Sequence, residues 1–449
     1  MCIRDSYSGV KGLLEKGKEV NHILHTVLSE GKKVESENNL DKLIMTQEAI
    51  RDGHTTLFEA TFKTDQAISQ LDLLQKNDDG TWDFTEVKSS SSSSTSLKKK
   101  INEYIDDAAI QYNVVSKTLK IKNVYVWVVN KDYEYDGKEY TLDFFHKIDV
   151  TEDVKNRADD MDLIIENSRV IVEDLQPTVG IGPQCKKPHD CPFMHTCWKR
   201  LNETDLAKIP ALRNKPKLLK DGIESATHEY FDTKGNQMAV QALRKNGVHI
   251  NKNELKKHLD AINSYGTIDF LDFEGLNHPV PLFPKTKPYE QIPFQYSIHR
   301  RERDGAISHK ECLASGKVDP SQEVAEKLAQ DIKDSEILLV YYKTYEIGVL
   351  KYLAEKYPQH SETFIGAIEK IYDLYDVVKK TIYHPDFNGS YSLKKVAPAL
   401  LGDKADWAGE LDNGAEAADI YVQAIHSFED DKERIFKELL IYCNQDTMN

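Results

Sequence analysis

Residues 266–276 read GTIDFLDFEGL, and this stretch decides the fold that we expect for the second half of the chain. Apolar residues fill it between an entering and an exiting glycine, which is typical of a buried strand. Asp272 and Glu274 interrupt the apolar run, and alternate residues of a strand project to the same face. The stretch therefore predicts a buried strand that presents two carboxylates side by side.

The residues that follow this strand predict an open α/β sheet. Two strand-like runs, QIPFQYSIHRR and AISHKECLA, are separated by an Asp-Gly pair, which is a strong hairpin signal. We expect a helix over about 322–333, a buried strand over 337–342 and a helix over 345–355. Glu346 then lies in the first turn of the last helix, beside the carboxyl end of the buried strand, where sites form in open α/β sheets.

A second acidic motif lies near the end of the sequence. Tyr442 and Asp446 are four residues apart in a helix-like stretch, so their side chains share one face of that helix. Carboxylates from the strand and from the helix can converge on one pocket, and carboxylates are natural ligands of Mg²⁺ and Mn²⁺. Two such ions about 4 Å apart stabilise the attacking and the leaving oxygen of a phosphodiester. The two motifs predict a metal-dependent nuclease site in which Tyr442 orients the attacking water.

These motifs resemble those of the RNase H-like exonucleases of the DEDD type, whose first motif is Asp-x-Glu and whose last, in the tyrosine subclass, is Tyr-x-x-x-Asp. The middle motif of that superfamily usually reads Asn-x-x-x-Phe-Asp, whereas residues 342–346 read YKTYE, with a glutamate in place of the aspartate. Two charges at a strand end and an amphipathic helix are the alternative reading. The resemblance implies metal ligands at four positions, Asp272, Glu274, Glu346 and Asp446.

The first third of the chain predicts a second sheet. Residues 55–62, 67–74 and 81–88 resemble three consecutive strands, and Asn-Asp-Asp-Gly between the last two is strong hairpin chemistry. A helix over about 97–117 and a strand over 122–130 follow. The pattern favours three consecutive strands, a helix and a fourth strand.

Asp72 lies on the second of these strands, and Glu86 and Lys88 share a face of the third because Val87 separates them. This constellation resembles the PD-(D/E)XK nucleases, especially their RecB-like branch. The resemblance implies that the two carboxylates hold a metal ion and that Lys88 polarises the attacking water, a role suited to a compact cation. Gln111 occupies the place of the helical glutamine of that branch. An ordinary salt bridge on a hairpin is the alternative.

Next to Lys88 is a serine run over 89–94, followed by further polar residues. Low-complexity sequence of this kind cannot bury apolar surface. We therefore expect a flexible loop here.

Three of the six cysteines, Cys185, Cys191 and Cys197, are clustered in PQCKKPHDCPFMHTCW. Thiolate clusters hold iron-sulfur centres or zinc. The segment resembles the tail of the iron-sulfur RecB-like nucleases, in which three late cysteines join one early cysteine around a [4Fe-4S] cluster. Zinc with His189 or His195 as a further ligand, and unligated thiols, are the alternatives.

Composition limits the class of protein. Six cysteines in 449 residues are too few for a secreted disulfide scaffold, and no apolar run reaches membrane-spanning length, so we expect a cytoplasmic protein. The net charge of −15 argues against strong non-specific binding to a polyanion, although a narrow basic strip can still guide a strand. Lys394 and Lys395 are candidate phosphate contacts. The expected divisions are a nuclease domain over 7–200, a lysine-rich helical connector over 201–265 and an exonuclease domain over 266–449.

The chain as a whole resembles an uncharacterised bacterial family, domain of unknown function 2779, which joins a RecB-like PD-(D/E)XK nuclease, a cysteine cluster and an RNase H-like exonuclease. The segments that carry the resemblance are FEATF, EVKSS, IDDAAIQY, IGPQCKKPHDCPF, FLDFEG, PYEQIPFQYSIH, YHPDFNGSYSLKKVAPAL and YCNQDT. The resemblance implies an α/β protein with a restriction-endonuclease-like domain and an RNase H-like domain, and it implies that both ends are incomplete.

The motifs together predict a nuclease that uses Mg²⁺ or Mn²⁺ and acts on DNA, at single-stranded ends, in repair, recombination or defence. A helicase or a repair complex is the expected partner, and no membrane is involved. An RNA-trimming 3′–5′ exonuclease is one alternative. A non-catalytic nucleic-acid or helicase adaptor with an iron-sulfur docking domain is another.

Overall fold

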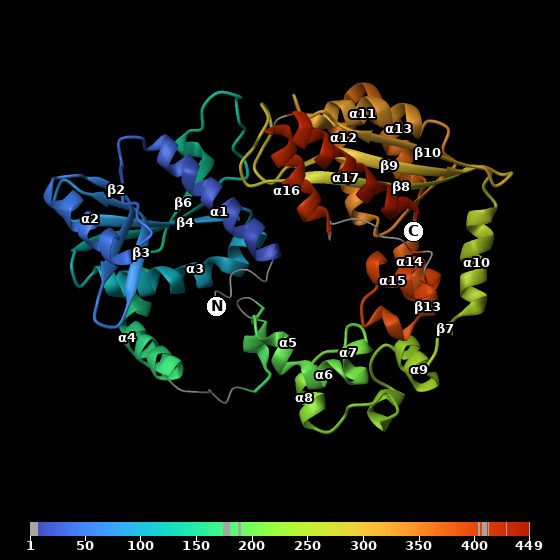
Figure 1. Cartoon of the computed structure of the whole chain (residues 1–449), viewed down its shortest axis with the longest axis horizontal. Helices are drawn as coiled ribbons and strands as arrows, with labels where there is room; N and C mark the ends of the chain where they lie inside the picture. Colours follow the sequence, from blue (N-terminus) through green and yellow to red (C-terminus); the bar gives the residue numbers. More distant parts are fainter. Residues whose placement is uncertain are drawn as a thin grey trace. The chain divides into compact units, whose positions relative to one another are not determined.

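The computed structural model describes residues 8–173, 180–186, 190–402, 405, 411, 413–427 and 429–448. The protein is a mixed α/β protein whose helices and strands are drawn in Figure 1. It divides into two compact units, one of residues 1–179 with 277–290 and the other of residues 180–276 with 291–449. Each unit contains one large sheet.

The sheet of the first unit has six strands in the order β1-β2-β3-β4-β5-β6. The three predicted strands, the hairpin between the last two and the strand after the helix are confirmed as β2, β3, β4 and β5. The strand β3 pairs antiparallel with both β2 and β4, and β5 runs parallel to β4. The parallel step is possible because the helix α3 (Ser94–Val115) carries the chain from β4 back to the start of β5. The strands are β1 (Lys32–Lys33), β2 (Thr56–Lys63), β3 (Ile68–Lys76), β4 (Trp82–Ser91), β5 (Ile121–Val129) and β6 (Phe145–Asp149).

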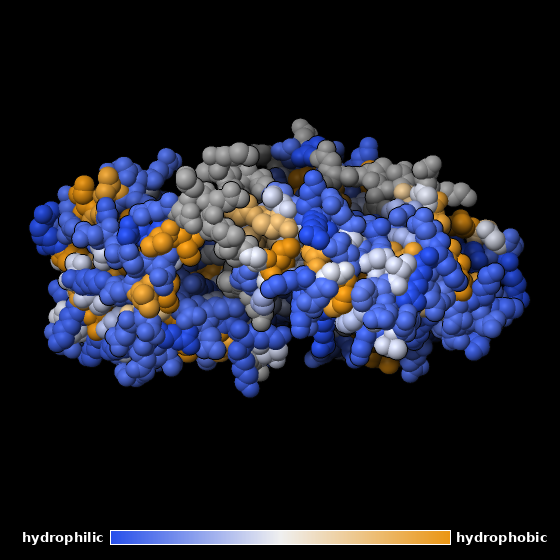
Figure 2. Space-filling model, turned by 90° about the horizontal axis from the view of Figure 1, so that it is seen from below, coloured by the Kyte–Doolittle hydropathy of each residue, from blue (hydrophilic) through white to orange (hydrophobic). Residues whose placement is uncertain are grey.

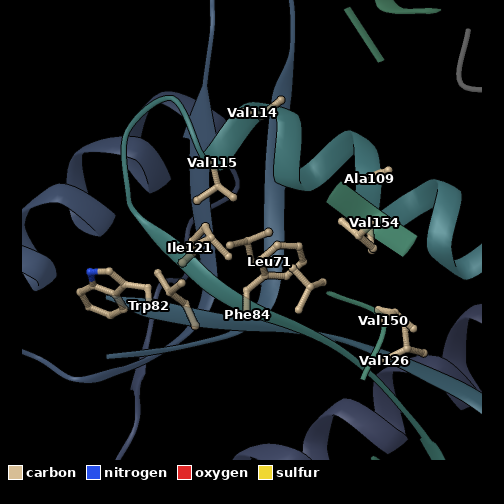
Figure 3. Packing of buried hydrophobic residues seen from close by; sticks show 14 of the residues in the cluster. Leu71, Trp82, Phe84, Ala109, Val114, Val115, Ile121, Val126, Val150 and Val154 are labelled. Carbon is tan, nitrogen blue, oxygen red and sulfur yellow. The ribbon is translucent and has the colours of Figure 1, made fainter. Parts of the chain in front are cut away.

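Helices cover both faces of this sheet because apolar residues alternate along its strands. Leu71, Phe84 and Val126 point into a core that they share with α2 (Asn39–Arg51), α3 and α4 (Thr151–Glu173), as Figure 3 shows for part of the cluster. The neighbouring residues Phe58, Leu73 and Val87 pack on the opposite face, against Val20, Ile23 and Leu24 of α1 (Ser8–Val27). Residues 277–290 join this unit, where the Tyr135 N–H donates to the Thr286 carbonyl over 3.0 Å.

The serine run is not the loop that its composition predicts. The strand β4 continues to Ser91, which pairs with Val129, and the Ser92 N–H donates to the Val129 carbonyl over 2.8 Å. The helix α3 then begins at Ser94. The prediction was wrong because backbone hydrogen bonds to β5 hold the segment, and these bonds need no apolar side chain.

The sheet of the second unit has five strands in the order β10-β9-β8-β11-β12. The predicted Asp-Gly hairpin joins β9 and β10, with Gly305 at φ +86°, a backbone conformation that glycine adopts without strain. The strands β8, β11 and β12 are parallel to one another, so their carboxyl ends lie at one edge. The strands are β8 (Ile268–Asn277), β9 (Gln291–Arg301), β10 (Ile307–Leu313), β11 (Ile337–Val340) and β12 (Ile371–Asp373).

This sheet is also covered on both faces. Leu271 and Phe273 of β8 pack on one face with α11 (Pro320–Asp331), α12 (Thr344–Lys356) and α13 (Ser361–Glu369). The helices α11 and α12 confirm the two helices predicted for this region. On the other face lies α17 (Glu429–Met448), whose Leu439 carbonyl accepts a 2.9 Å hydrogen bond from the buried Gln295 side chain. The remaining helices of this region are α14 (Leu374–Thr381), α15 (Leu393–Leu401) and α16 (Gly414–Ile425).

Residues 180–265 belong to the second unit and form short helices joined by turns. Residues 180–200 were predicted to belong to the first domain, but they lie in the second unit and include α5 (Met194–Cys197). The next helix, α6 (Lys199–Asn202), packs against α7 (Asp205–Lys208) and α8 (Lys215–Lys220). Further on, β7 (His249–Ile250), between α9 (Gln237–Lys245) and α10 (Lys252–Asn263), pairs with β13 (Ile382–Tyr383). These contacts explain why the segment stays with the C-terminal sheet.

The face of the protein drawn in Figure 2 is mostly hydrophilic, with apolar residues in small separate groups. None of the helices in the described ranges is both long and apolar enough to cross a membrane.

Candidate functional site

Three carboxylates meet in the second unit. One oxygen from each of Asp272, Glu274 and Asp446 lies within 4.8 Å of the others. Within the described ranges, this is the one group of three or more His, Cys, Asp or Glu side chains that meets this distance. Oxygen atoms at this spacing fit a shared Mg²⁺ or Mn²⁺ ion.

Local periodicity explains how the three side chains meet. Leu271 and Phe273 are each 2 % exposed and point into the core, which turns Asp272 and Glu274 to the other face of β8. The helix α17 lies on that face, and its buried Cys443 thiol donates to the Asp272 carboxylate over 3.7 Å. Asp446 follows Cys443 by three residues and thus lies on the same side of the helix.

The electrostatics of the group disfavour three bare negative charges. Burial, and then the carboxylates of Glu274 and Asp446, hold the pKa of Asp272 well above its ordinary value. Burial and Asp446 likewise raise the pKa of Glu274 to about 8, although Lys394 opposes this rise. A divalent cation would relieve the repulsion, because it favours the charged form of each carboxylate.

Tyr442 and Lys394 flank the three carboxylates. The Lys394 ammonium lies 4.7 Å from the centre of the Tyr442 ring. Burial, and then Glu274 and Asp446, raise the pKa of the Tyr442 phenol, so the phenol keeps its proton at neutral pH. Lys395 is an exposed neighbour on α15.

Glu346 lies close to this group but is not part of it. Its charge raises the pKa of Asp272 and of Glu274, yet its oxygens fall outside the 4.8 Å group. The side chain is 2 % exposed, and its Oε2 atom has no hydrogen-bond partner within the described residues. Burial, and then repulsion by Asp373, raises the pKa of Glu346 to about 8.

Asp373 is a residue that the sequence analysis missed. Its carboxylate accepts backbone hydrogen bonds from Tyr342 (2.9 Å), Lys343 (3.2 Å) and Tyr375 (3.0 Å). Tyr342 has φ +77°, a strained conformation for a bulky residue, and these bonds hold it there. Asp373 thereby fixes the start of α12 and the position of Glu346. The strand that Asp373 ends has three residues, so no local periodicity marks this residue in the sequence.

A cavity of about 660 Å³ opens beside the carboxylates. Asp272, Asp446 and Lys394 line it together with many apolar side chains. The lining also contains Arg300 and Arg301, and this size, with apolar walls and a few polar and charged groups, is typical of small-molecule sites. Among the apolar lining residues are Phe270, Tyr341, Leu393, Val396 and Leu400.

The structure also brings together the predicted site residues of the first unit. Asp72 accepts hydrogen bonds from the Val87 N–H over 2.7 Å and from the Asn21 side chain over 3.2 Å. Burial, and then the charge of Glu86, hold its pKa well above the ordinary value. The Gln111 side chain donates to Glu86 over 2.7 Å.

Lys88 lies between two carboxylates in this site, 2.8 Å from Glu86 and 2.8 Å from Asp107. Burial lowers the pKa of the Lys88 ammonium, but the two neighbouring carboxylates outweigh burial and leave the pKa raised. The sequence analysis missed Asp107 and also Glu59, whose backbone has φ +58° and whose charge raises the pKa of Asp72. Glu59 has no partner in the β2–β3 register, and a break of this kind leaves no local sequence signal.

The three clustered cysteines lie in the second unit. The Cys191 N–H donates to the Cys185 carbonyl over 2.8 Å, which places their backbones side by side. Cys185 is buried and Cys197 is exposed at the end of α5. Within the described residues, the three Sγ atoms do not all lie within 4.8 Å of one another. His195 is exposed, and His189 lies outside the described residues.

We expect the metal-free second unit to lose stability as the pH rises from 4.5 to 8. In this window folded Glu346 keeps a proton that the unfolded chain releases, because its pKa is about 8 in the folded protein and 4.5 for an ordinary glutamate. The expected loss is roughly 3–5 kcal/mol. Urea titrations in EDTA at several pH values measure it.

The variant Glu346→Gln provides the control for this pH dependence. It cannot ionise, so the pH dependence should become shallower, with the contributions of Asp272 and Glu274 remaining, and the variant should be more stable than the parent at pH 8. An unchanged slope would contradict the assignment of the proton to Glu346.

Comparison with known proteins places part of this site in a family. No curated protein matches the chain. Residues 269–392 match the model of the family described as "Domain of unknown function (DUF2779)". The matched segment contains Asp272, Glu274, Glu346 and Asp373, while Asp446 follows it. This segment of the chain is therefore similar to the DUF2779 family.

Proposed function

We propose that the second unit is a metal-dependent nuclease that hydrolyses phosphodiester bonds of DNA at single-stranded ends. The observation that carries the proposal is the group formed by Asp272, Glu274 and Asp446, whose oxygens lie within 4.8 Å of one another. The neighbouring cavity of about 660 Å³ has room for a terminal nucleotide.

The carboxylates fit Mg²⁺ or Mn²⁺ better than they fit an organic cofactor. All three are oxygen ligands, and burial together with repulsion among the carboxylates raises the pKa of Asp272 and of Glu274, which a bound cation would offset. Bound divalent ions would stabilise the attacking and the leaving oxygen of the phosphodiester.

The other side chains of the site have roles that follow from their positions. Tyr442 remains a neutral phenol and so is suited to orient a water molecule or a phosphate oxygen by hydrogen bonding, not to remove a proton. Lys394 lies over that ring and offers a positive charge to a substrate phosphate. Glu346 is placed to join the carboxylates when a second ion is bound.

The fold supports the same proposal. The order β8, β9, β10, α11, β11 and α12 is the order of elements on which the resemblance to the RNase H-like exonucleases rests. The first unit likewise has the strands and the helix expected of a RecB-like PD-(D/E)XK domain. We therefore propose a second nuclease site in the first unit, formed by Asp72, Glu86, Lys88 and Gln111.

The variant Lys88→Met tests this second site. We expect a loss of about 10²-fold in the activity of the first unit, since positioning a reacting proton is typically worth that much. Cleavage should be measured in a protein that also carries Asp272→Asn, which leaves the first unit as the remaining source of activity. Lys63→Met, an exposed lysine at the end of β2, is the matched control. Equal rates in the two variants would contradict the assignment.

We also propose that the three cysteines hold a [4Fe-4S] cluster together with one further ligand. A tetrahedral zinc ion would bring its sulfur ligands within roughly 3.8 Å of one another, from Zn–S bonds of about 2.3 Å. The Sγ atoms of the described residues lie too far apart for a preformed zinc site of this kind, whereas the sulfurs of a cubane bind separate irons.

Anaerobically purified protein should therefore be brown, with visible absorption that is lost in Cys191→Ala. Cys312→Ala, which removes a buried thiol elsewhere, should retain the colour. A colourless protein that contains stoichiometric zinc would contradict the cluster.

The substrate is tested by direct comparison. Purified protein with Mn²⁺ should degrade single-stranded DNA faster than duplex DNA or RNA. If RNA is degraded faster than single-stranded DNA, RNA is the substrate. Binding to the strands or to a helicase without any cleavage would identify an adaptor instead.

A further inference from the structure

A second cavity of the second unit lies away from the carboxylates. It has a volume of about 980 Å³ and is formed by residues from 181 to 220 together with Asn388. The residues assigned to the proposed nuclease sites are absent from its described lining.

The lining of this cavity is basic in an acidic protein. Four lysines, Lys186, Lys215, Lys217 and Lys220, contribute to it. No Asp or Glu is present among its described lining residues, although the chain as a whole has a net charge of −15. A cavity with this charge attracts anions and repels cations.

Trp198 supplies an aromatic face and an unused donor in the same lining. Its indole Nε1 is buried and has no hydrogen-bond partner within the described residues. Buried Trp N–H groups usually have a partner, so this donor calls for an acceptor. The Lys186 ammonium lies 5.2 Å from the centre of the ring, which places a positive charge beside the aromatic face.

Lys215 is the most constrained of the four lysines. Its ammonium donates to the Ala207 carbonyl over 3.1 Å, and burial, followed by the charge of Lys186, lowers its pKa. Two ammonium groups that repel each other in a half-buried site are stabilised by an anion placed between them.

The part of the lining next to Asn388 is closely packed. Gly389 has φ +76°, and a Cβ atom there would lie 2.5 Å from the Ala207 carbonyl oxygen. The Tyr383 hydroxyl donates to the adjacent Lys208 carbonyl. These contacts tie the segment that carries Asn388 to residues 207 and 208, and Asn388 and Ala207 both line the cavity.

We propose that this cavity binds the phosphate of a nucleotide, with Lys186 and Lys215 as its cationic ligands and Trp198 as hydrogen-bond donor and aromatic contact. An aromatic face beside clustered lysines is how proteins hold nucleotides without reading their sequence. The nucleotide is either free or part of a strand. The second case rests on the proposed nuclease function, whereas nucleotide binding itself does not.

The test uses the full chain and a fluorescent decamer of thymidine, and binding is read as fluorescence anisotropy in EDTA. Because EDTA removes the ions that cleavage needs, the result does not depend on nuclease activity. The double variant Lys186→Gln/Lys215→Gln should bind at least 10-fold more weakly, and its salt dependence should fall by roughly 0.7 per lost phosphate contact. Trp198→Phe keeps an aromatic ring without the donor and should weaken binding about threefold, an effect of the size of one hydrogen bond.

The matched control is Lys245→Gln/Lys252→Gln, which removes the same charge from exposed positions of the same unit. Competition identifies the source of the nucleotide: displacement by thymidine monophosphate supports a free nucleotide, and displacement by unlabelled decamer alone supports a strand. A parent protein that binds neither the decamer nor thymidine monophosphate, or equal losses in the two double variants, overturns the proposal.

Discussion

Asp272→Asn should abolish cleavage by the second unit, with a loss of at least about 10³-fold at saturating Mn²⁺. The residue contributes one of the three oxygens that lie within 4.8 Å of one another, and an amide oxygen carries no net charge to offset a divalent ion. Several kcal/mol of transition-state stabilisation depend on that ion, and each 1.4 kcal/mol or so corresponds to a tenfold change in rate. Initial rates on single-stranded DNA measure the effect in a protein that also carries Lys88→Met.

Asp334→Asn is the matched control for this loss. It makes the same chemical change at an exposed position before β11, at the opposite end of the parallel strands from Asp272. Its rate should match that of the parent. If both variants retain full activity, the carboxylate group is not the site of cleavage.

Asp269→Ala should cause the largest loss of stability in the second unit, about 3–5 kcal/mol. Asp269 is fully buried and binds the Arg300 guanidinium through two hydrogen bonds of 2.7 Å each. Ser335 donates to the same carboxylate. Removal of Asp269 leaves the largely buried Arg300 without its counter-charge. Urea unfolding followed by circular dichroism measures the change.

Two further variants test whether the loss of stability comes from the unpaired charge of Arg300. Asp269→Leu/Arg300→Met removes both charges and should recover much of the stability, because no unpaired charge remains. Lys256→Met, which breaks the exposed pair with Asp260, should cost less than about 1 kcal/mol. If Asp269→Ala is as stable as the parent, the buried ion pair does not contribute to the stability of the second unit.

The carboxylate group could be predicted because it depends on two local periodicities. Asp272 and Glu274 are two residues apart on a strand, and Tyr442 and Asp446 four apart on a helix, so each pair faces one way before any tertiary contact is known. The strand β8 is long and apolar, so the sequence predicted it as a strand from a clear pattern.

Other parts of the sites could not be predicted because they depend on distant contacts or on short elements. Asp373 ends a strand of three residues, which is too short to show a period. Glu59 lies at a break in pairing that only the partner strand reveals. The lysine-rich cavity needs Asn388, which reaches α7 and α8 from a segment far along the chain. Composition alone was also misleading at Ser91, where pairing with β5 decides the structure.

Asp272, Glu274 and Asp446 should together hold a divalent metal ion, and anomalous diffraction from crystals grown with Mn²⁺ would locate that ion. We expect a strong manganese peak within bonding distance of an oxygen from each of the three carboxylates, and no such peak in crystals of Asp272→Asn. Crystals of the parent protein at saturating Mn²⁺ without a peak at these oxygens would rule out a metal site there.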